Sequence, residues 1–330
     1  MSVRRSAVCG LRHRRAATVS RRQERIGLVF AALCAFDGAF VPAVAKLTTE
    51  RGAPLFVAAM TTLFGAAFAM IVLGVRGELR FLARRATGPR LAAVGALGTG
   101  VSFLLFFEGA SRSTAIETVL CLQIEPAYAL LAAWLFLGHQ PTLRRVVAIG
   151  VLLIGITLAV GGRGWTPSPG AWLLLVTPLC WQASHLLVLR GLVGVPPSVL
   201  TGARYIHGAI VLAICWLVNG GVATLPARSV LVGLLPLLAV QGIVLSYVGT
   251  LLWYQAVTRL DLARATAIVV PSIPALSLVA TFMLLGEVPV ARQVIGLVLT
   301  ATGVLAFATT THATEPRSRI RHETPGVAAD

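Results

Sequence analysis

The sequence predicts an all-α integral membrane protein with ten transmembrane helices, arranged as two inverted five-helix repeats with both termini in the cytoplasm. Its composition, a series of apolar runs and an internal repeat support this fold class. Of the 330 residues, 57% are hydrophobic and only 12% are charged, whereas soluble domains carry about 25% charged residues. So few charges could not cover the surface of a water-soluble protein of this size.

Ten apolar runs follow one another along the chain, separated by charged residues or by Pro and Gly. A membrane-spanning helix needs about 20 apolar residues, so ten spans use most of the chain and leave no room for a separate soluble domain. The runs lie at about 26–47, 54–75, 91–111, 115–138, 146–161, 170–190, 198–219, 229–257, 264–286 and 290–310.

The net charge of +16 is concentrated on one side of these helices. Eight Arg precede the first run. With the N-terminus placed in the cytoplasm, the inner segments hold 21 of the 28 basic residues and the outer loops hold six. Basic residues gather on the cytoplasmic side of membrane helices, so this asymmetry predicts a multi-pass protein of a bacterial inner membrane, with cytoplasmic tails at 1–25 and 311–330. Nucleic acid binding is a weaker explanation of the charge.

An internal repeat divides the membrane part into two halves, at 26–162 and 163–310. LFLGHQPTLRRVVAIGVLLIG at 135–155 matches MLLGEVPVARQVIGLVLTATG at 283–303 with an offset of 148 residues. Each half contains five helices, and an odd number places the two copies in opposite orientations. Inverted repeats of this kind build a binding site near the membrane midplane in many secondary transporters, and they permit alternating access to it.

These motifs resemble the drug/metabolite transporter superfamily, and in particular its EamA-type ten-helix members. The likeness covers residues 26–310 and rests on LFLG-x-x-P, on the LLGE that ends at Glu287, and on an Arg seven residues after a Pro, at Arg204. It implies a transporter of small molecules. Asp37 stands about where family members often carry Trp, as at Trp181 in the second half. The Glu125-Pro126 pair is similar to an acidic variant seen in amino-acid exporters of this superfamily.

Three acidic residues fall inside predicted spans, at Asp37, Glu117 and Glu125. An Asp at the centre of a membrane helix costs roughly 2.5–3.5 kcal/mol, so such a group must face a cavity, meet a partner or carry a proton. Glu117 and Glu125 are two helical turns apart and are predicted to share one helix face. We interpret all three acids as candidate substrate- and proton-binding groups. The alternative is that they form structural hydrogen bonds between helices.

Five further residues are candidates for the same site. Arg204 could clamp a substrate carboxylate or extend to the cytoplasmic interface, and His207, one turn later, shares its face. Trp181, Tyr254 and Gln255 could supply stacking and hydrogen bonds to a cavity. Each of these side chains has a structural alternative in helix packing.

The sequence favours a secondary active transporter that exports a small metabolite, an amino acid or a related polar or amphipathic compound, by proton exchange. A uniporter, exchanger or channel without proton coupling is the alternative. A membrane-embedded enzyme is disfavoured. A two-Asp intramembrane protease would need Asp261, which lies between Arg259 and Arg264 at a helix end, and no other catalytic motif is present. No cofactor or metal is expected. The expected partners are the substrate, protons and the lipid bilayer, and a homodimer is left open.

Overall fold

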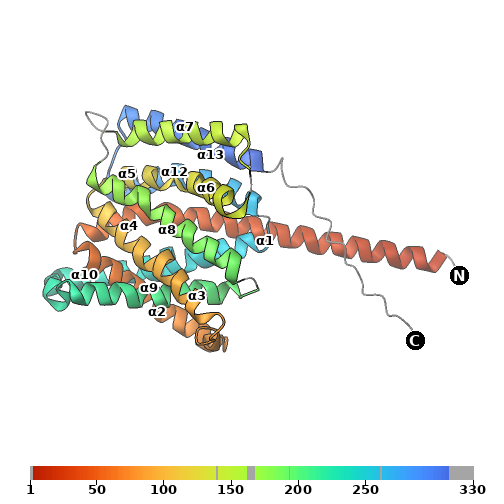
Figure 1. Cartoon of the computed structure of the whole chain (residues 1–330), viewed down its shortest axis with the longest axis horizontal. Helices are drawn as coiled ribbons and strands as arrows, with labels where there is room; N and C mark the ends of the chain where they lie inside the picture. The colour runs from red at the N-terminus through yellow and green to blue at the C-terminus, as the bar shows by residue number, and fades with distance from the viewer. Residues whose placement is uncertain (1–2, 139, 162–167, 193, 261, 312–330) are drawn as a thin grey trace.

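A computed structural model describes residues 3–138, 140–161, 168–192, 194–260 and 262–311. All the regular elements in these ranges are helices, shown in Figure 1. They are α1 (Val3–Thr49), α2 (Pro54–Val75), η1 (Leu79–Phe81), α3 (Gly88–Gly95), η2 (Ala96–Val101), α4 (Ser102–Ser111), α5 (Ala115–Leu122), α6 (Glu125–Leu137), α7 (Leu143–Val160), α8 (Pro169–Gly191), α9 (Pro197–Val218), η3 (Gly221–Thr224), α10 (Arg228–Ala239), η4 (Val240–Val248), α11 (Gly249–Val257), α12 (Leu262–Leu285) and α13 (Ala291–Thr311).

These elements form the membrane crossings that the apolar runs predict. Within the described residues, nine helical stretches are long and apolar enough to span a membrane, and a shorter apolar stretch, Val269–Leu285, belongs to α12. The third crossing combines α3, η2 and α4, the fourth combines α5 and α6, and the eighth combines α10, η4 and α11. The predicted all-helical membrane fold is confirmed.

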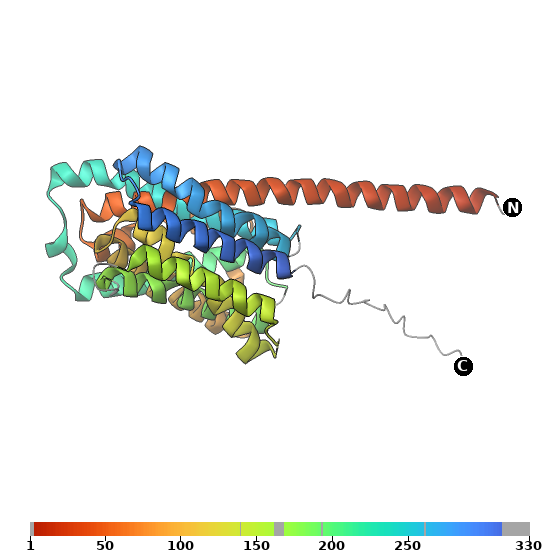
Figure 2. The ribbon, with the colours of Figure 1, turned by 90° about the horizontal axis from the view of Figure 1, so that it is seen from above.

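The two ends of the described chain lie at the same end of the bundle. The first half of α1 projects from the end at which α13 finishes (Figure 2). We call this end the terminal side and the opposite end the distal side. The helix of α1 begins at Val3, and so it extends through most of the segment that the sequence analysis treats as a polar tail. Ala, Arg and Gln in that segment favour helix even where apolar periodicity is missing.

Three crossings depart from a regular α-helix. Crossing three contains the π-helical segment η2, and crossing eight contains the π-helical segment η4. In the alignment of the two halves with an offset of 148 residues, η2 coincides with the end of η4. The fourth crossing is broken after Leu122, and α6 restarts at Glu125. Pro126 explains the break, because it has no N–H to donate and its ring clashes with the carbonyl four residues earlier. The prediction that Glu117 and Glu125 share one continuous helix face is therefore wrong.

The closest packing between the two halves joins α7 to α13, which lie side by side in Figure 1. A Cβ atom at Gly155 would lie 2.5 Å from the backbone nitrogen of Thr300, and one at Gly303 would lie 2.6 Å from that of Leu152. The earlier residue of each helix thus meets the later residue of the other, so the two helices run antiparallel. Glycine at both positions permits this approach.

Two carboxylates link the halves at opposite ends of the bundle. On the distal side, the backbone N–H groups of Ala115 and Ile116 at the start of α5 donate to the carboxylate of Glu287, at 3.2 and 3.3 Å. On the terminal side, the hydroxyl of Ser198 at the start of α9 donates to Glu78 at 2.5 Å. A carboxylate at a helix N-terminus is stabilised by the free N–H groups and the helix dipole.

Candidate functional site

Two cavities lie among the helices that surround the break in the fourth crossing. The smaller has a volume of about 190 Å³, and Gly38, Val41, Pro42, Val119, Leu122, Gln123, Glu125, Trp181, Val270 and Ile273 line it. The larger has a volume of about 240 Å³, and Glu125, Pro126, Ala129, Gln182, His185, Val188, Leu189, Trp253, Tyr254, Val257, Val270 and Phe307 line it. The larger cavity lies toward the terminal side, because α8, α11 and α13 contribute residues from their last turns.

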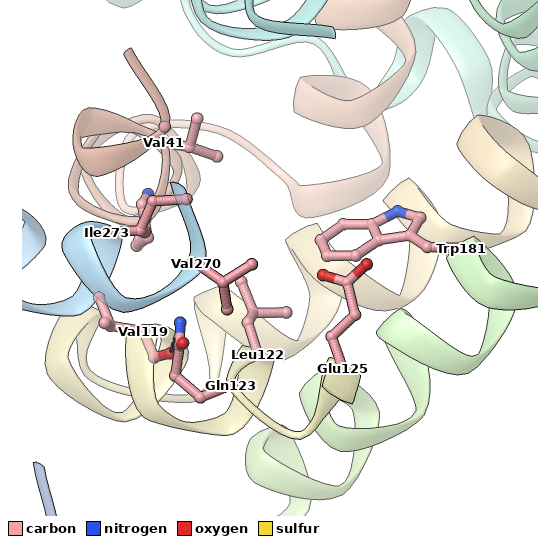
Figure 3. Close-up of a pocket in the computed structure, with 10 residues that line it drawn as sticks. Val41, Val119, Leu122, Gln123, Glu125, Trp181, Val270 and Ile273 are labelled. Atoms are coloured by element: carbon pink, nitrogen blue, oxygen red, sulfur yellow. Dashed lines mark hydrogen bonds between the residues drawn. The ribbon is translucent and has the colours of Figure 1, made fainter. Parts of the chain in front are cut away.

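Glu125 lines both cavities, and Val270 is the other residue that is common to their two linings. It is the first residue of α6, so the N-terminal end of that helix dipole favours its negative charge. Its Oε1 accepts a hydrogen bond of 2.8 Å from Nε2 of Gln182 on α8. Figure 3 shows its carboxylate directed toward the indole of Trp181. The break in the fourth crossing thus places one carboxylate at the boundary of the two cavities.

Several polar groups that line the cavities have no hydrogen-bond partner within the described part of the chain. They are Oε1 of Gln123 and Nε1 of Trp181 in the smaller cavity, and the hydroxyl of Tyr254 in the larger one. An unsatisfied buried donor or acceptor costs about 1–3 kcal/mol. The hydrogen-bonding capacity of these atoms is thus left unused by the described residues around the cavities.

The larger cavity has a mostly apolar lining that contains a few polar groups. Glu125, Gln182 and His185 supply ionisable or hydrogen-bonding groups, whereas Val188, Leu189, Trp253, Val257 and Phe307 supply apolar surface. Small-molecule sites commonly combine apolar walls with a few polar groups that fix the orientation of the ligand. This arrangement suits a small amphipathic molecule with a charged head.

Asp37 lies outside both cavities, although Gly38 and Pro42 on the same helix line the smaller one. Its side chain is buried, with 8% of the residue exposed, and its Oδ2 has no hydrogen-bond partner within the described chain. The carboxylate lies against the backbone of Gly249, where a Cβ atom would overlap Oδ2. The structure thus separates the two acids that the sequence analysis assigns to one cavity.

Arg204 and His207 on α9 also lie outside the two cavities. Arg204 is 7% exposed, and its Nη2 donates to the carbonyl of Gly98 in η2 at 2.5 Å. Extension to the membrane interface is therefore excluded. Its guanidinium exerts an electrostatic influence on Glu125 but forms no salt bridge with it in the described part of the chain. His207 is hydrogen-bonded through Nδ1 to the carbonyl of Ala203 in its own helix at 3.0 Å, which is a structural role.

Glu117 and Gln255 make local contacts at helix ends. Glu117 closes a capping box with Thr114: its backbone N–H donates to the Thr114 hydroxyl at 3.0 Å, and its carboxylate accepts from the Thr114 backbone N–H at 3.3 Å. This Thr-x-x-Glu pattern is a known start signal for a helix. The side chain of Gln255 accepts a hydrogen bond from Arg259. The structure thus places neither residue in a cavity.

Gln123, Gln182 and His185 are polar lining residues that are not among the candidates of the sequence analysis, and Gln123 lies closest to Glu125 in the sequence. It is 6% exposed and lies two residues before Glu125, at the end of α5. A polar amide two residues before Glu-Pro in an apolar run is the signal that could have identified it. Trp253 and Phe307 carry no such signal, because an aromatic residue in an apolar run does not stand out from its neighbours.

The fold and these cavities define a class: a multi-pass membrane protein with two mostly apolar cavities that share one carboxylate, beside the break in the fourth crossing. The EamA-like transporter family model matches the chain twice, over residues 25–161 and 168–309. The chain belongs to the EamA-like transporter family, and it is a transporter and not an enzyme.

Two bacterial relatives and one solved structure are similar to the chain. The probable terminal-alkyne amino-acid exporter of Streptantibioticus cattleyicolor is 28% identical over 225 residues, which are 66% of this chain and 72% of the relative. The uncharacterized transporter YyaM of Bacillus subtilis is 23% identical over 268 residues, which are 79% and 87% of the two chains. The match to a crystal structure covers 87% of this chain and 99% of the chain in that structure, with a TM-score of 0.61 and 20% sequence identity. This likeness supports the fold.

Proposed function

We propose that this EamA-like transporter exports a small amphipathic amine, an amino acid or a related compound, in exchange for protons. The observation that carries the proposal is the position of Glu125, a carboxylate on the boundary between two cavities in the centre of the bundle. A ligand in either cavity would therefore lie next to this group.

The charge and shape of the larger cavity support an amine substrate with an apolar tail. A carboxylate pairs well with an ammonium group, because hydrogen bonds between ionised partners are about twice as strong as neutral ones. Trp253, Val257 and Phe307 would contact the apolar tail. The printed name of the Streptantibioticus relative describes an amino-acid exporter, which agrees with this class of substrate.

Proton exchange follows from the chemistry of one carboxylate that serves two ligands. An ionised Glu125 would bind the substrate ammonium, and a protonated Glu125 would release it. A neutral carboxyl is also far less costly than a charged one inside a membrane. The substrate and the proton then compete for the same group, and each cycle exports one and imports the other.

Alternating access would follow from an inverted repeat with cytoplasmic termini. The contacts of Gly155 with Thr300 and of Gly303 with Leu152 exchange under the offset of 148 residues, which supports two halves related by a two-fold axis in the membrane plane. The excess of Arg on the terminal side supports a cytoplasmic orientation for that side. The larger cavity would then receive the substrate from the cytoplasm.

A metabolite screen followed by counterflow tests the proposal. Extracellular pools of a deletion strain and an overexpressing strain are compared, and a panel of radiolabelled amino acids and amines, with a terminal-alkyne amino acid among them, is then tested in proteoliposomes. Wild-type protein and the surface variant Glu50→Gln should show counterflow, whereas Glu125→Gln should not. Full counterflow by Glu125→Gln would refute the role of this carboxylate. Flux of a solute without counterflow would identify a channel.

A further inference from the structure

Asp37 is a buried acid that the proposed substrate pathway does not use. It lies on α1, near the middle of the first crossing, and it lines neither of the two cavities around Glu125. One of its carboxylate oxygens has no hydrogen-bond partner in the described chain. A buried ionised group without a partner is costly, so a residue in this position needs a reason to be there.

The carboxylate contacts the eighth crossing where its helix changes from π-helical to α-helical. Gly249 is the first residue of α11 and directly follows the π-helical segment η4. A Cβ atom there would overlap Oδ2 of Asp37 and lie 3.3 Å from its Cγ. One turn earlier on α1, the Cys34 thiol donates to the Gly249 carbonyl at 3.7 Å. Two side chains of α1 thus contact the same residue, Gly249.

The helix that begins at this contact forms part of the wall of the larger cavity. Trp253 and Tyr254 lie four and five residues after Gly249 on α11, and both line that cavity together with Val257. Any displacement of α11 at Gly249 would move these side chains. π-helical turns are rare and occur frequently at functional sites, and here one ends at the residue that Asp37 touches.

The surroundings of Asp37 suit a proton as its ligand. The Cys34 thiol on α1 and the Tyr205 phenol on α9 are ionisable groups in electrostatic contact with its carboxylate. Arg204, the neighbour of Tyr205 on α9, acts on that phenol and on Glu125, and its guanidinium donates to the carbonyl of Gly98. From α11 the Asp37 carboxylate contacts Gly249. The hydroxyl of the next residue, Thr250, is hydrogen-bonded to the Tyr205 phenol at 3.0 Å.

A metal cation fits this position poorly. α12 packs against the adjoining residue Gly38 through the apolar side chain of Ile273. Hard cations require about six oxygen ligands, and no group of three or more His, Cys, Asp or Glu side chains occurs among the described residues. A proton needs only the carboxylate, and the protonated form gains an O–H that can donate to the backbone of the junction between η4 and α11.

We propose that Asp37 is a second proton-binding site, separate from the substrate pathway, and that its protonation repositions α11 and thereby changes the wall of the larger cavity. The inference rests on the proposed function for its biological use. The inference itself states that α11 responds to pH even when no substrate is present. An ionised Asp37 repels electron-rich groups at the junction, whereas a protonated one can bond to them, so α11 has two arrangements that pH selects.

The test is a spin-label measurement on α11 that requires neither substrate nor transport. In a cysteine-free background, a nitroxide is attached at Val257→Cys and its mobility and accessibility are measured by electron paramagnetic resonance between pH 5 and 9, in liposomes. We expect a pH-dependent change in the wild-type background, a complete loss of that change with Asp37→Asn, and retention with Glu125→Gln. A response that Glu125→Gln abolishes and Asp37→Asn retains would overturn the inference, as would the absence of any response.

A matched pair of glycine substitutions gives a second test that leaves Asp37 in place. Gly249→Ala puts a methyl group where the carboxylate lies and should abolish the response. Gly233→Ala is on α10 of the same crossing, where an added Cβ meets nothing within 4 Å, and should retain it. Equal behaviour of the two variants would refute the contact. The label is also measured at constant pH in buffers that contain either Na⁺ or choline. A response to Na⁺ that is lost with Asp37→Asn would identify Na⁺, and not the proton, as the ligand of Asp37.

The two proposals fail in different ways. If the label responds as expected but proteoliposomes show no coupled transport, the proton exchange proposed for Glu125 is wrong and the site at Asp37 stands. If coupled transport is found but the label does not respond through Asp37, the inference about Asp37 is wrong and the proton exchange proposed for Glu125 stands.

Discussion

Replacement of Gly155 by Ala should destabilise the protein, whereas replacement of Gly150 on the same helix should not. Both residues lie inside α7, and glycine inside a helix costs roughly 0.5–1 kcal/mol relative to alanine. A Cβ atom at Gly150 meets nothing within 4 Å, so Gly150→Ala should keep this gain. A Cβ atom at Gly155 would lie 2.5 Å from the Thr300 nitrogen and 2.7 Å from the Gly296 carbonyl oxygen.

The Thr300 nitrogen and the Gly296 oxygen belong to the backbone of α13, so rotation of a side chain cannot relieve the overlap with them. The helices have to move apart, and overpacking of this kind costs about 1–3 kcal/mol. Because the propensity gain is common to both variants, the difference between them is the overpacking cost itself. Thermal unfolding of detergent-purified fusions, followed by fluorescence-detected size exclusion, measures that difference. Equal stability of the two variants would refute the packing of α7 on α13 and remove the main support for the inverted repeat.

Three further predictions concern the ends of the helices. Glu287→Ala should destabilise the protein by about 0.5–2 kcal/mol, because the first N–H groups of α5 lose their acceptor; an unchanged melting temperature would contradict the contact. Glu117→Gln should transport at the wild-type rate, because Gln can replace Glu in a capping box; a loss of transport would return Glu117 to the site. In intact cells an impermeant maleimide should label Arg51→Cys and not Arg85→Cys, and the reverse pattern would overturn the orientation.

The membrane crossings were predictable because their signal is local. A run of about 20 apolar residues identifies a span whatever surrounds it, and the ten predicted runs correspond to the crossings of the described chain. The helical state of the residues before Arg22 was missed, because a charged segment without an apolar face gives no such signal although its residues favour helix.

The site was predictable only in part, since it depends on contacts between distant segments. Glu125 was identified because an acid inside an apolar run before Pro is unusual, and the structure places it between the two cavities. Its hydrogen bond to Gln182 joins residues 57 positions apart, which no local pattern reveals. Glu117 has the same character in the sequence as Glu125, yet it caps a helix, because Thr114 lies three residues before it.

The central claim is that the substrate and the proton share Glu125 on the boundary between the cavities. In proteoliposomes that contain the substrate found by the screen, an imposed pH gradient should drive its uphill movement, and a protonophore should abolish the accumulation but spare exchange. With Glu125→Gln the accumulation should be lost, whereas Glu50→Gln should accumulate as the wild-type protein does. Gradient-driven accumulation by Glu125→Gln at the wild-type rate would contradict the claim.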